Sequence, residues 1–330
     1  MTDQDSRASA LSEQVQRSWR TFTEVFEPLR ADLYRYCRYL TRSAWDAEDL
    51  VQDTLARGFA TLAKMGALPA QPRAWILRVA SNLWIDRVRR ATRERALPTG
   101  PESATVAEDP QAVREAAGTL LVQLAPQERA AIVLKEVFGL SLDEIAGVLS
   151  TTVGAVKAAL HRGRERLVEP EAERARVPVP GAIEAFCAAF NAADVDALAA
   201  VLLQHSVVEV VGATVQYGPE AARQTVLPGM LFGSACMAEG FSGLDPKMYE
   251  GVLATTPRVE ARFHRDRWVL VHWYAHTDGE AVRAVTELDL EGEHVARLRN
   301  YFFTPELIAE VCDELGLPHR SNGVRWCVAD

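Results

Sequence analysis

The chain has 330 residues, a hydrophobic content of 48% and a formal net charge of −9. This length allows two or three compact domains, and this composition excludes a disordered protein. No apolar run approaches the roughly 20 residues that cross a bilayer, and the first ten residues lack a signal pattern. We therefore expect a cytoplasmic protein without a membrane partner.

The cysteines argue against a disulfide framework or a metal centre. All 5 are scattered, and no Cys-x-x-Cys pair occurs, which is typical of reduced thiols. A site built from Cys312, His319 and Cys327 is disfavoured because its spacing matches no zinc pattern. We expect no metal and no cofactor.

Charge is distributed unevenly along the chain. Residues 1–170 carry 23 Lys and Arg against 22 Asp and Glu, a net charge of +1, whereas residues 171–330 carry 13 against 23, a net charge of −10. Within the first half, residues 78–95 hold six arginines with only Asp86 and Glu94, a net charge of +4. Such a local basic stretch is typical of a nucleic-acid footprint.

Periodicity divides the chain into three blocks. Helical periodicity runs from about 19 to 167 and is interrupted by a linker rich in Pro, Gly, Ser and acidic residues. Alternating prolines mark a second linker, after which two helices (181–192 and 194–203) precede alternating, β-branched strand patterns at 206–213, 267–278, 281–290 and 294–303. The predicted organisation is a flexible N-terminus (1–18), an all-α domain (19–96), a linker (97–111), a second all-α domain (112–168), a linker (169–180), an α+β domain (181–308) and a C-terminal tail (309–330).

The first block contains an acidic helix that starts near residue 43. Ser43 suits the N-cap, with Asp46 at the third helical position. A buried stripe is predicted for Leu50, Leu55, Phe59 and Leu62. The polar residues left outside it are Glu48, Asp49, Gln52, Asp53 and Arg57. Charge pattern alone favours a solvated face.

The next helix, within 73–90, combines arginines with tryptophans. A rotation of 100° per residue places Ile76, Val79, Ala80 and Leu83 on the core face and Arg78, Asn82 and Arg89 in a separate row. Arginines in such a row can hold phosphates, Asn can hydrogen-bond a base edge, and exposed indoles can stack on unpaired bases. A structural tryptophan beside a solvated arginine face explains the same pattern, so the helix alone leaves both interpretations open.

The two helices in succession, "DAEDLVQDTLARGFATL" and "PRAWILRVASNLWIDRVRR", resemble region 2 of sigma-70 factors of the extracytoplasmic-function (ECF) type. "FEPLRADLYRYCRYLT" resembles the preceding helix of that region. The resemblance implies that the acidic helix binds the clamp coiled coil of the RNA polymerase β′ subunit through Asp49, Gln52 and Asp53. It also implies that the second helix melts the −10 promoter element and holds its non-template strand, through Trp75, Arg78, Asn82, Asp86 and Arg89.

The second block carries helix-turn-helix spacing. Pro126 suits a first helical position, Ser141 and Glu144 form a capping box, and "VLSTTVGAV" is a short turn between two helices. A plain helical hairpin would show the same spacing. On the second helix the predicted core face is Val153, Val156, Leu160 and Leu167. The predicted groove face is Ala155, Ala158 and Arg162, flanked by Lys157, Arg164 and Arg166.

This block resembles sigma region 4, which binds the −35 element and the polymerase β-flap. The resemblance assigns −35 contacts to Thr152, Ala155, Lys157, Ala158, Arg162 and Arg164. Relatives often carry Thr, Ser and Arg where this chain has Ala155, Ala158 and Ala159. We therefore expect a bare groove face that depends on backbone contacts and DNA shape.

The third block resembles the polyketide cyclase SnoaL-like branch of the nuclear transport factor 2 superfamily over 181–308. The resemblance implies a cone in which a curved sheet and helices enclose a pocket. Strand alternation places Trp268, Leu270, His272, Tyr274 and His276 on one face, where with Glu209, Glu287 or Arg299 they line a pocket or form an acid/base pair. The candidate pocket residues are Trp268, His272, Tyr274 and Arg299. Ordinary hydrogen bonds on a half-buried sheet explain them equally well, and the paired carboxylates of the superfamily's enzymes have no clear counterpart.

Together the three resemblances imply a multidomain sigma factor that is not an enzyme, with two all-α sigma domains and an α+β SnoaL-like domain. The predicted partners are core RNA polymerase and promoter DNA, with a small ligand of the C-terminal domain left open. A short linker gives that domain a high effective concentration near the helical blocks, which favours regulation in cis. Two alternatives stay open: a helix-turn-helix regulator independent of polymerase, and ligand-binding or isomerase-like activity in the C-terminal domain.

Overall fold

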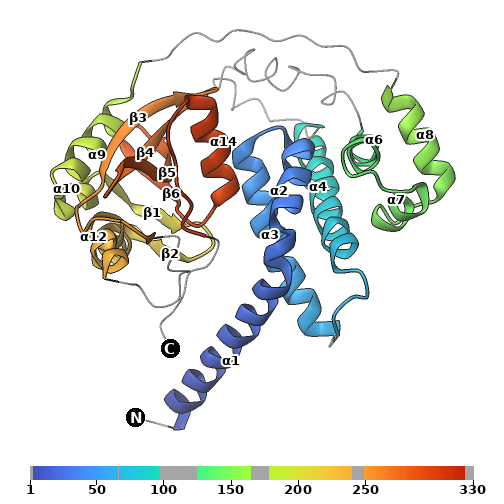
Figure 1. Cartoon of the computed structure of the whole chain (residues 1–330), viewed down its shortest axis with the longest axis horizontal. Coiled ribbons are helices and arrows are strands. Elements are labelled where there is room, and N and C mark those ends of the chain that lie inside the picture. Colours follow the sequence, from blue (N-terminus) through green and yellow to red (C-terminus); the bar gives the residue numbers. More distant parts are fainter. Residues whose placement is uncertain (1–2, 66, 97–124, 165–177, 240–248, 324–330) are drawn as a thin grey trace. The chain divides into compact units, whose positions relative to one another are not determined.

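The computed structural model describes residues 3–65, 67–96, 125–164, 178–239 and 249–323 (Figure 1). The chain divides into two compact units, Met1–Glu173 and Arg174–Asp330. The two all-α blocks that the sequence separates therefore belong to one unit. The predicted linker at 97–111 and residues 169–177 of the second linker lie outside the described residues.

Unit 1 begins with a set of helices around an aromatic core. These are α1 (Asp3–Phe26), the short 3-10 helix η1 (Glu27–Leu29), α2 (Arg30–Thr41), α3 (Ala44–Met65) and α4 (Pro72–Ala96). Phe22 stacks between Trp19 and Phe26, with ring centroids 5.4 Å and 4.6 Å away. Residues 3–18, predicted as a flexible N-terminus, are instead the first turns of α1. Residues 3–26 contain neither Gly nor Pro, so nothing in this stretch interrupts the helix.

A second set of helices completes unit 1. It consists of α6 (Pro126–Ile132), the π-helical turn η3 (Val133–Val137), α7 (Leu142–Val148) and α8 (Val153–Arg164). The predicted caps are confirmed: Ser141 Oγ accepts from the Glu144 amide at 3.2 Å, and Glu144 Oε2 accepts from the Ser141 amide at 2.7 Å. The Asp46 amide likewise donates to Ser43 Oγ at 3.3 Å at the start of α3.

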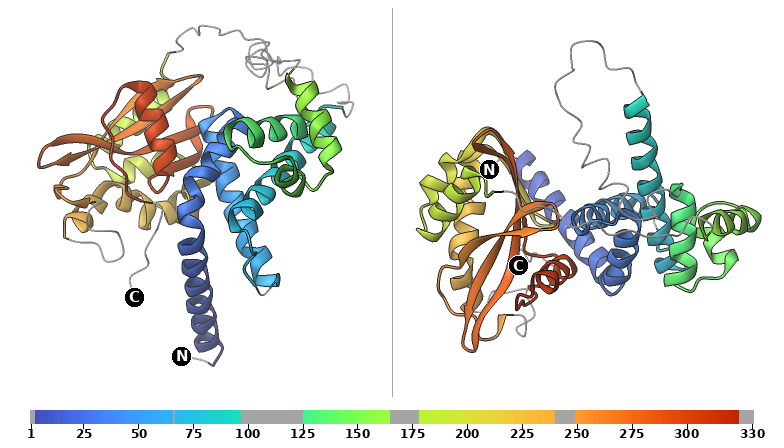
Figure 2. Two further views of the ribbon diagram at one scale, coloured as in Figure 1. Left: turned by 45° about the vertical axis from the view of Figure 1, so that its right-hand side comes forward. Right: turned by 90° about the horizontal axis from the view of Figure 1, so that it is seen from above.

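Unit 2 is an α+β fold around one six-stranded sheet of order β2-β1-β6-β5-β4-β3. Its elements are α9 (Gly181–Asn191), α10 (Val195–Ala200), β1 (Leu202–Val210), β2 (Thr214–Tyr217), α11 (Gly218–Gln224), α12 (Val226–Ala238), β3 (Arg258–His264), β4 (Arg267–His276), β5 (Gly279–Glu291), β6 (His294–Tyr301) and α14 (Pro305–Leu315). β1 runs parallel to β6, and the other neighbouring pairs are antiparallel. Helices α9 to α12 lie along one face of the curved sheet, and α14 lies against the other (Figures 1 and 2).

The main core of unit 2 lies between α9–α12 and the sheet. Phe186, Phe190 and Leu227 from the helices pack there with Leu270 and Leu298 from the strands. Burial of these side chains supplies the main driving force for this packing. The core fixes α12 across the sheet, and this placement creates the cavity described below.

The end of the chain, predicted as a tail from residue 309, is part of the fold as far as residue 323. α14 extends to Leu315, and the following segment pairs with β5: the Val282 amide donates to Pro318 O at 2.8 Å, and the Arg320 amide donates to Val282 O at 2.9 Å. Farther along this segment, Asn322 Oδ1 accepts a hydrogen bond from Nε of the buried Arg283 at 2.7 Å. In the described parts of the chain, no helix is both long enough and apolar enough to cross a membrane.

Candidate nucleic-acid interface and C-terminal cavity

The predicted arginine row is an exposed face of α4. Arg78, Asn82, Asp86 and Arg89 are all exposed, whereas Ile76 and Ala80 on the predicted core face are buried and Val79 and Leu83 are half-buried. The helical period thus separates the faces as expected. The exposed row combines guanidinium groups with an amide, which suits phosphates and base edges.

The tryptophans of α4 are half-buried, which agrees with the structural alternative that the sequence pattern of this helix left open. The half-buried Trp75 ring lies 5.7 Å from the Phe26 ring, and a Cβ added at Gly58 would lie 3.4 Å from it. Trp84 is half-buried beneath the Arg129 guanidinium, which is 5.5 Å from the ring centroid. Both indoles lie between helices, where their large apolar surfaces are partly removed from water.

The acidic helix α3 exposes Asp53 and half-buries Asp49 and Gln52. Asp53 forms an ion pair with Arg87 of α4. Glu48, predicted outside the core, is fully buried and accepts a hydrogen bond from Arg30 Nη2 at 2.5 Å. Gln52 Nε2 donates to the same carboxylate at 2.6 Å. The amphipathic pattern predicts the position of Glu48 wrongly because this carboxylate is buried together with the guanidinium that pairs with it.

Five of the six residues assigned to the −35 element are exposed: Thr152, which directly precedes α8, and Ala155, Lys157, Ala158 and Arg162 on α8. Thr152 Oγ1 accepts from the Ala155 amide at 3.2 Å and thereby begins the helix, and Arg162 Nε donates to Glu128 at 2.5 Å. Ala159, expected on the groove face, is buried with Val156 and Leu160. The side chain of Arg164 lies outside the described residues, as do Arg166 and Leu167.

Within unit 1, the second helix set packs on the first through cationic and aromatic contacts. The Phe138 ring meets Tyr36 edge-on at 5.7 Å, with the guanidinium groups of Arg35 and Arg73 at 5.0 Å and 5.5 Å. Arg129 Nη1 donates to the Leu40 carbonyl at 2.5 Å, and its burial lowers its pKa to about 10. Cation–π contacts of this kind add stability when they are desolvated.

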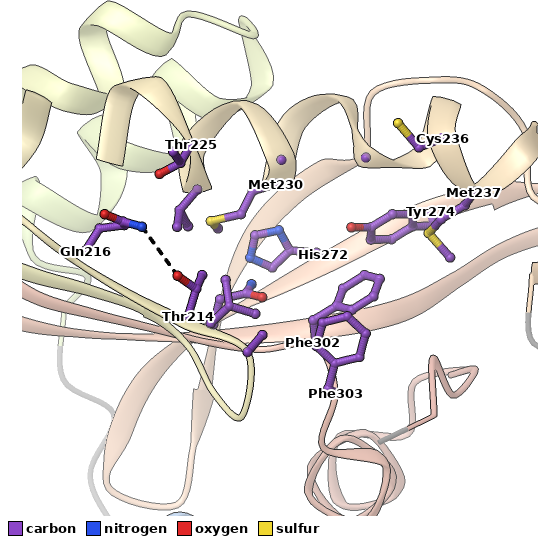
Figure 3. Close-up of a pocket in the computed structure, with 16 residues that line it drawn as sticks. Thr214, Gln216, Thr225, Met230, Cys236, Met237, His272, Tyr274, Phe302 and Phe303 are labelled. Atoms are coloured by element: carbon purple, nitrogen blue, oxygen red, sulfur yellow. Dashed lines mark hydrogen bonds between the residues drawn. The ribbon is translucent and has the colours of Figure 1, made fainter. Parts of the chain in front are cut away.

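In unit 2, the four predicted pocket residues do not converge on one site. His272 and Tyr274 of β4 line a cavity of about 510 Å³ between α12 and the sheet (Figure 3). Trp268 lies at a different hollow, where its indole N–H donates to Pro178 O at 3.2 Å. Arg299 forms an ion pair with Glu287 at 2.6 Å.

Glu287 lines the same hollow as Trp268, but among the described residues neither Glu209 nor Glu287 pairs with a histidine of β4 in an acid/base site. Glu287 is held by Arg267, by Arg299 and by the Tyr301 hydroxyl, which donates at 3.3 Å. Glu209 pairs with Arg297 at 3.1 Å. Both carboxylates are therefore occupied by arginines, and neither lines the cavity.

The polar part of the cavity is a row across three strands. His272 Nε2 shares a hydrogen with Thr286 Oγ1 at 2.8 Å, and Asn300 Nδ2 donates to the same oxygen at 2.9 Å. Burial lowers the pKa of His272 to about 3 and raises the pKa of the Tyr274 hydroxyl well above its usual value, so both groups are uncharged at neutral pH. Asn300 was missed from sequence because its position beside Thr286 depends on strand register.

No cluster of His, Cys, Asp or Glu able to hold a metal ion occurs among the described residues. Of the disfavoured zinc set, Cys312 is buried in α14, and burial raises the pKa of its thiol to about 12. Cys327 lies outside the described residues.

Comparisons with known proteins match both helical sets and extend beyond them. The family model "Sigma-70 region 2" matches residues 25–94, and "Sigma-70, region 4" matches residues 114–167. The ECF RNA polymerase sigma factor SigJ of Mycobacterium tuberculosis is 30% identical over 290 residues, which cover 75% of this chain and 89% of SigJ. Because unit 1 ends at Glu173, a match to 75% of the chain extends into unit 2.

Two further comparisons differ in how much they cover. The ECF RNA polymerase sigma factor SigE of Mycolicibacterium smegmatis is 36% identical over 148 residues, or 41% of this chain; the chain spans 55% of the length of SigE. The crystal structure of M. tuberculosis SigJ covers 87% of this chain and 98% of its own, with a TM-score of 0.30 and 21% identity.

Proposed function

The chain belongs to the ECF RNA polymerase sigma factors, and from this membership we propose that it directs core RNA polymerase to specific promoters. One observation carries the proposal: the region that matches sigma region 2 exposes Arg78, Asn82 and Arg89 as a single row on α4. A dissociable initiation subunit needs such a row to hold promoter DNA. The family is not an enzyme family.

We assign the three predicted contact sets to separate partners. Asp49, Gln52 and Asp53 of α3 bind the clamp of the β′ subunit. The exposed row of α4, together with Asp86 and Trp75, binds the −10 element. Since Trp75 is half-buried, it acts by supporting the helix or by turning outward when the DNA is melted.

The exposed face of α8 binds the −35 element. Its contact residues are Thr152, Ala155, Lys157, Ala158, Arg162 and Arg164. Two alanines on this face offer only methyl groups to base edges, so recognition rests mainly on phosphates and DNA shape. The β-flap is the polymerase contact of the same helix set.

Unit 2 regulates unit 1 in cis as a SnoaL-like domain without catalysis. Helices along one face of a curved sheet, with a cavity beneath α12, support the SnoaL-like assignment. The pairing of Glu209 and Glu287 with arginines supports a non-catalytic role. Because both units share one chain, unit 2 acts at a high effective concentration.

The polymerase contact is tested by binding fluorescently labelled protein to purified bacterial core polymerase. We expect the triple variant Asp49→Ala/Gln52→Ala/Asp53→Ala to bind core at least about tenfold more weakly, a loss near 1.4 kcal/mol. Glu220→Ala, which removes an exposed carboxylate from unit 2, is the matched control and keeps its affinity. Equal affinity of the triple variant and the control would remove α3 from the proposed interface.

A further inference from the structure

The cavity of unit 2 has the size and lining of a small-molecule site. Its volume of about 510 Å³ lies within the range of roughly 300–1,000 Å³ typical of such sites. Among the residues that the structure describes, those lining the cavity include no Asp, Glu, Lys or Arg. Met230 and Met237 of α12 face the rings of His272, Tyr274 and Phe302 across it (Figure 3).

Two glycines of α12 keep this space open. Gly229 and Gly233 are four residues apart, so they lie on one face of the helix, and both line the cavity. A Cβ added at either would meet no heavy atom within 4 Å in the described part of the structure. Glycine inside a helix is unfavourable, and here close packing gives no reason for it. The glycines leave room for a molecule that the protein does not itself supply.

Three nearly buried side chains present polar atoms to the same space. His272, Tyr274 and Asn300 are 1%, 4% and 3% exposed. Among the described residues, the Tyr274 hydroxyl, His272 Nδ1 and Asn300 Oδ1 have no hydrogen-bond partner, yet none of them is sealed from solvent. Buried polar groups are ordinarily paired, so these three atoms are sites for a ligand's own polar groups.

We propose that this cavity binds an uncharged, mainly apolar organic molecule that carries a hydroxyl or N–H group. An ionic ligand would lose its hydration without gaining a counter-ion from the described residues of the lining, because none of these carries a charged side chain. Asn300 Oδ1 can only accept a hydrogen bond, so the ligand supplies the donor. The aromatic rings and methionine thioethers suit a flat ring system.

The proposal deepens the regulatory role of unit 2. Binding itself does not depend on promoter recognition, but its effect on transcription rests on the proposed function. A chain that binds the probe and fails to initiate transcription would contradict only the sigma proposal. A chain that initiates transcription without binding the probe would contradict only the ligand.

Two probes with the same ring system test the charge preference of the full-length chain. N-phenyl-1-naphthylamine is uncharged and carries an N–H group, whereas 8-anilinonaphthalene-1-sulfonate adds a sulfonate. We expect the uncharged probe to bind at least about tenfold more tightly, measured by its fluorescence increase, because the sulfonate would be desolvated without a partner. Equal or tighter binding of the sulfonate would overturn the proposal.

Filling the cavity locates the probe. Gly233→Leu projects a side chain into the space and raises helix propensity, so we expect a folded chain with at least about tenfold weaker binding of the uncharged probe. Gly181→Leu, at an exposed helical glycine with equally open surroundings, is the matched control and keeps the wild-type affinity. Thermal melts confirm folding of both. Unchanged binding by a folded Gly233→Leu variant would show that the probe binds elsewhere.

Competition between two small aromatic compounds tests whether the cavity prefers a ligand with a hydrogen-bond donor. 2-Naphthol should displace the uncharged probe at about fivefold lower concentration than 2-methylnaphthalene, which has similar shape but no donor. Equal displacement by the two compounds would contradict the role assigned to Asn300 and Tyr274.

Discussion

Two carboxylates of α3, five positions apart, are expected to contribute very differently to the free energy of unfolding. Glu48 is paired with Arg30 in the interior, whereas Asp53 meets Arg87 at the surface. Glu48→Ala would remove one partner of a buried ion pair whose side chains are 4% and 0% exposed, and we expect the free energy of unfolding of unit 1 to fall by about 3–5 kcal/mol. Asp53→Ala should cost less than about 1 kcal/mol, because exposed ion pairs contribute little. Denaturant unfolding of both variants measures the difference, and similar losses would contradict the burial of Glu48.

His272 links the stability of unit 2 to pH. Its folded pKa is about 3, while an unfolded histidine titrates near 6.5, so the unfolded chain takes up the proton first as pH falls. Stability from this group is therefore fully present above about pH 6.5 and is lost below it, at up to about 1.4 kcal/mol per pH unit. Between pH 7 and pH 5, we expect wild type to lose about 2 kcal/mol more than His272→Asn in denaturant unfolding. Equal losses of stability in the two proteins would mean that His272 takes up its proton over the same pH range in the folded and in the unfolded chain.

Side-chain positions could be predicted from sequence where one helix decides them. The helical period of α4 assigns Arg78 and Asn82 to the surface and Ile76 to the core, and the caps at Ser43 and Ser141 follow from local spacing. The burial of Glu48 could not be predicted in this way, because its partner is 18 positions away on another helix. The two indoles of α4 are also placed by neighbouring helices rather than by α4 itself.

At the scale of elements, α4 is expected to contribute electrostatic binding to promoter DNA. Each arginine that neutralises a phosphate displaces about one counterion, so Arg78→Ala and Arg89→Ala should each reduce the salt slope of holoenzyme–promoter binding by about 1. Arg223→Ala, an exposed arginine of unit 2 paired with Asp196, serves as the control and leaves the slope unchanged. Promoter binding measured across a salt series gives the slopes. Wild-type slopes for both α4 variants would exclude this face from the DNA contact.

From the proposed −10 and −35 contacts, we expect the contacts between the helix sets of unit 1 to loosen when both promoter elements are bound. Elements at −10 and −35 are about 25 base pairs, or roughly 85 Å, apart along the duplex. α4 and α7 are close enough that a Cβ on Gly147 would lie 3.9 Å from Arg78.

We expect Phe138→Ala, which removes the ring between Tyr36 and two arginines, to increase the radius of gyration in X-ray scattering of a chain ending at Arg176. Tyr39→Ala removes an exposed aromatic of α2 and should change nothing. An unchanged radius in both variants would mean that Phe138 does not hold the two sets together.

Strand and helix prediction in unit 2 succeeded where the pattern was strong. The alternating segments at 267–278 and 281–290 are β4 and β5, whereas α12 escaped prediction because "VLPGMLFGSACMA" contains a proline and two glycines and has no polar face. The chain end escaped prediction because backbone hydrogen bonds to Val282 hold it, and these leave no mark on side-chain pattern.

At the scale of the whole molecule, the chain consists of two compact units. The helical unit carries the proposed polymerase and promoter contacts, and the α+β unit carries the cavity. Because the units share one chain, a separate protein of residues 178–330 added in equimolar amount should reproduce little of the regulatory effect. Full regulation by the separate domain would mean that the tether is dispensable. Run-off transcription with the chain ending at Arg176, in the presence and absence of the separate 178–330 protein, measures the regulatory effect.

The most direct test is run-off transcription with purified bacterial core polymerase on a promoter library, with the full chain compared with a version ending at Arg176. We expect initiation to depend on added protein, and we expect the two versions to differ in output because unit 2 is absent from one. If neither version binds core polymerase or directs initiation, the sigma function is contradicted.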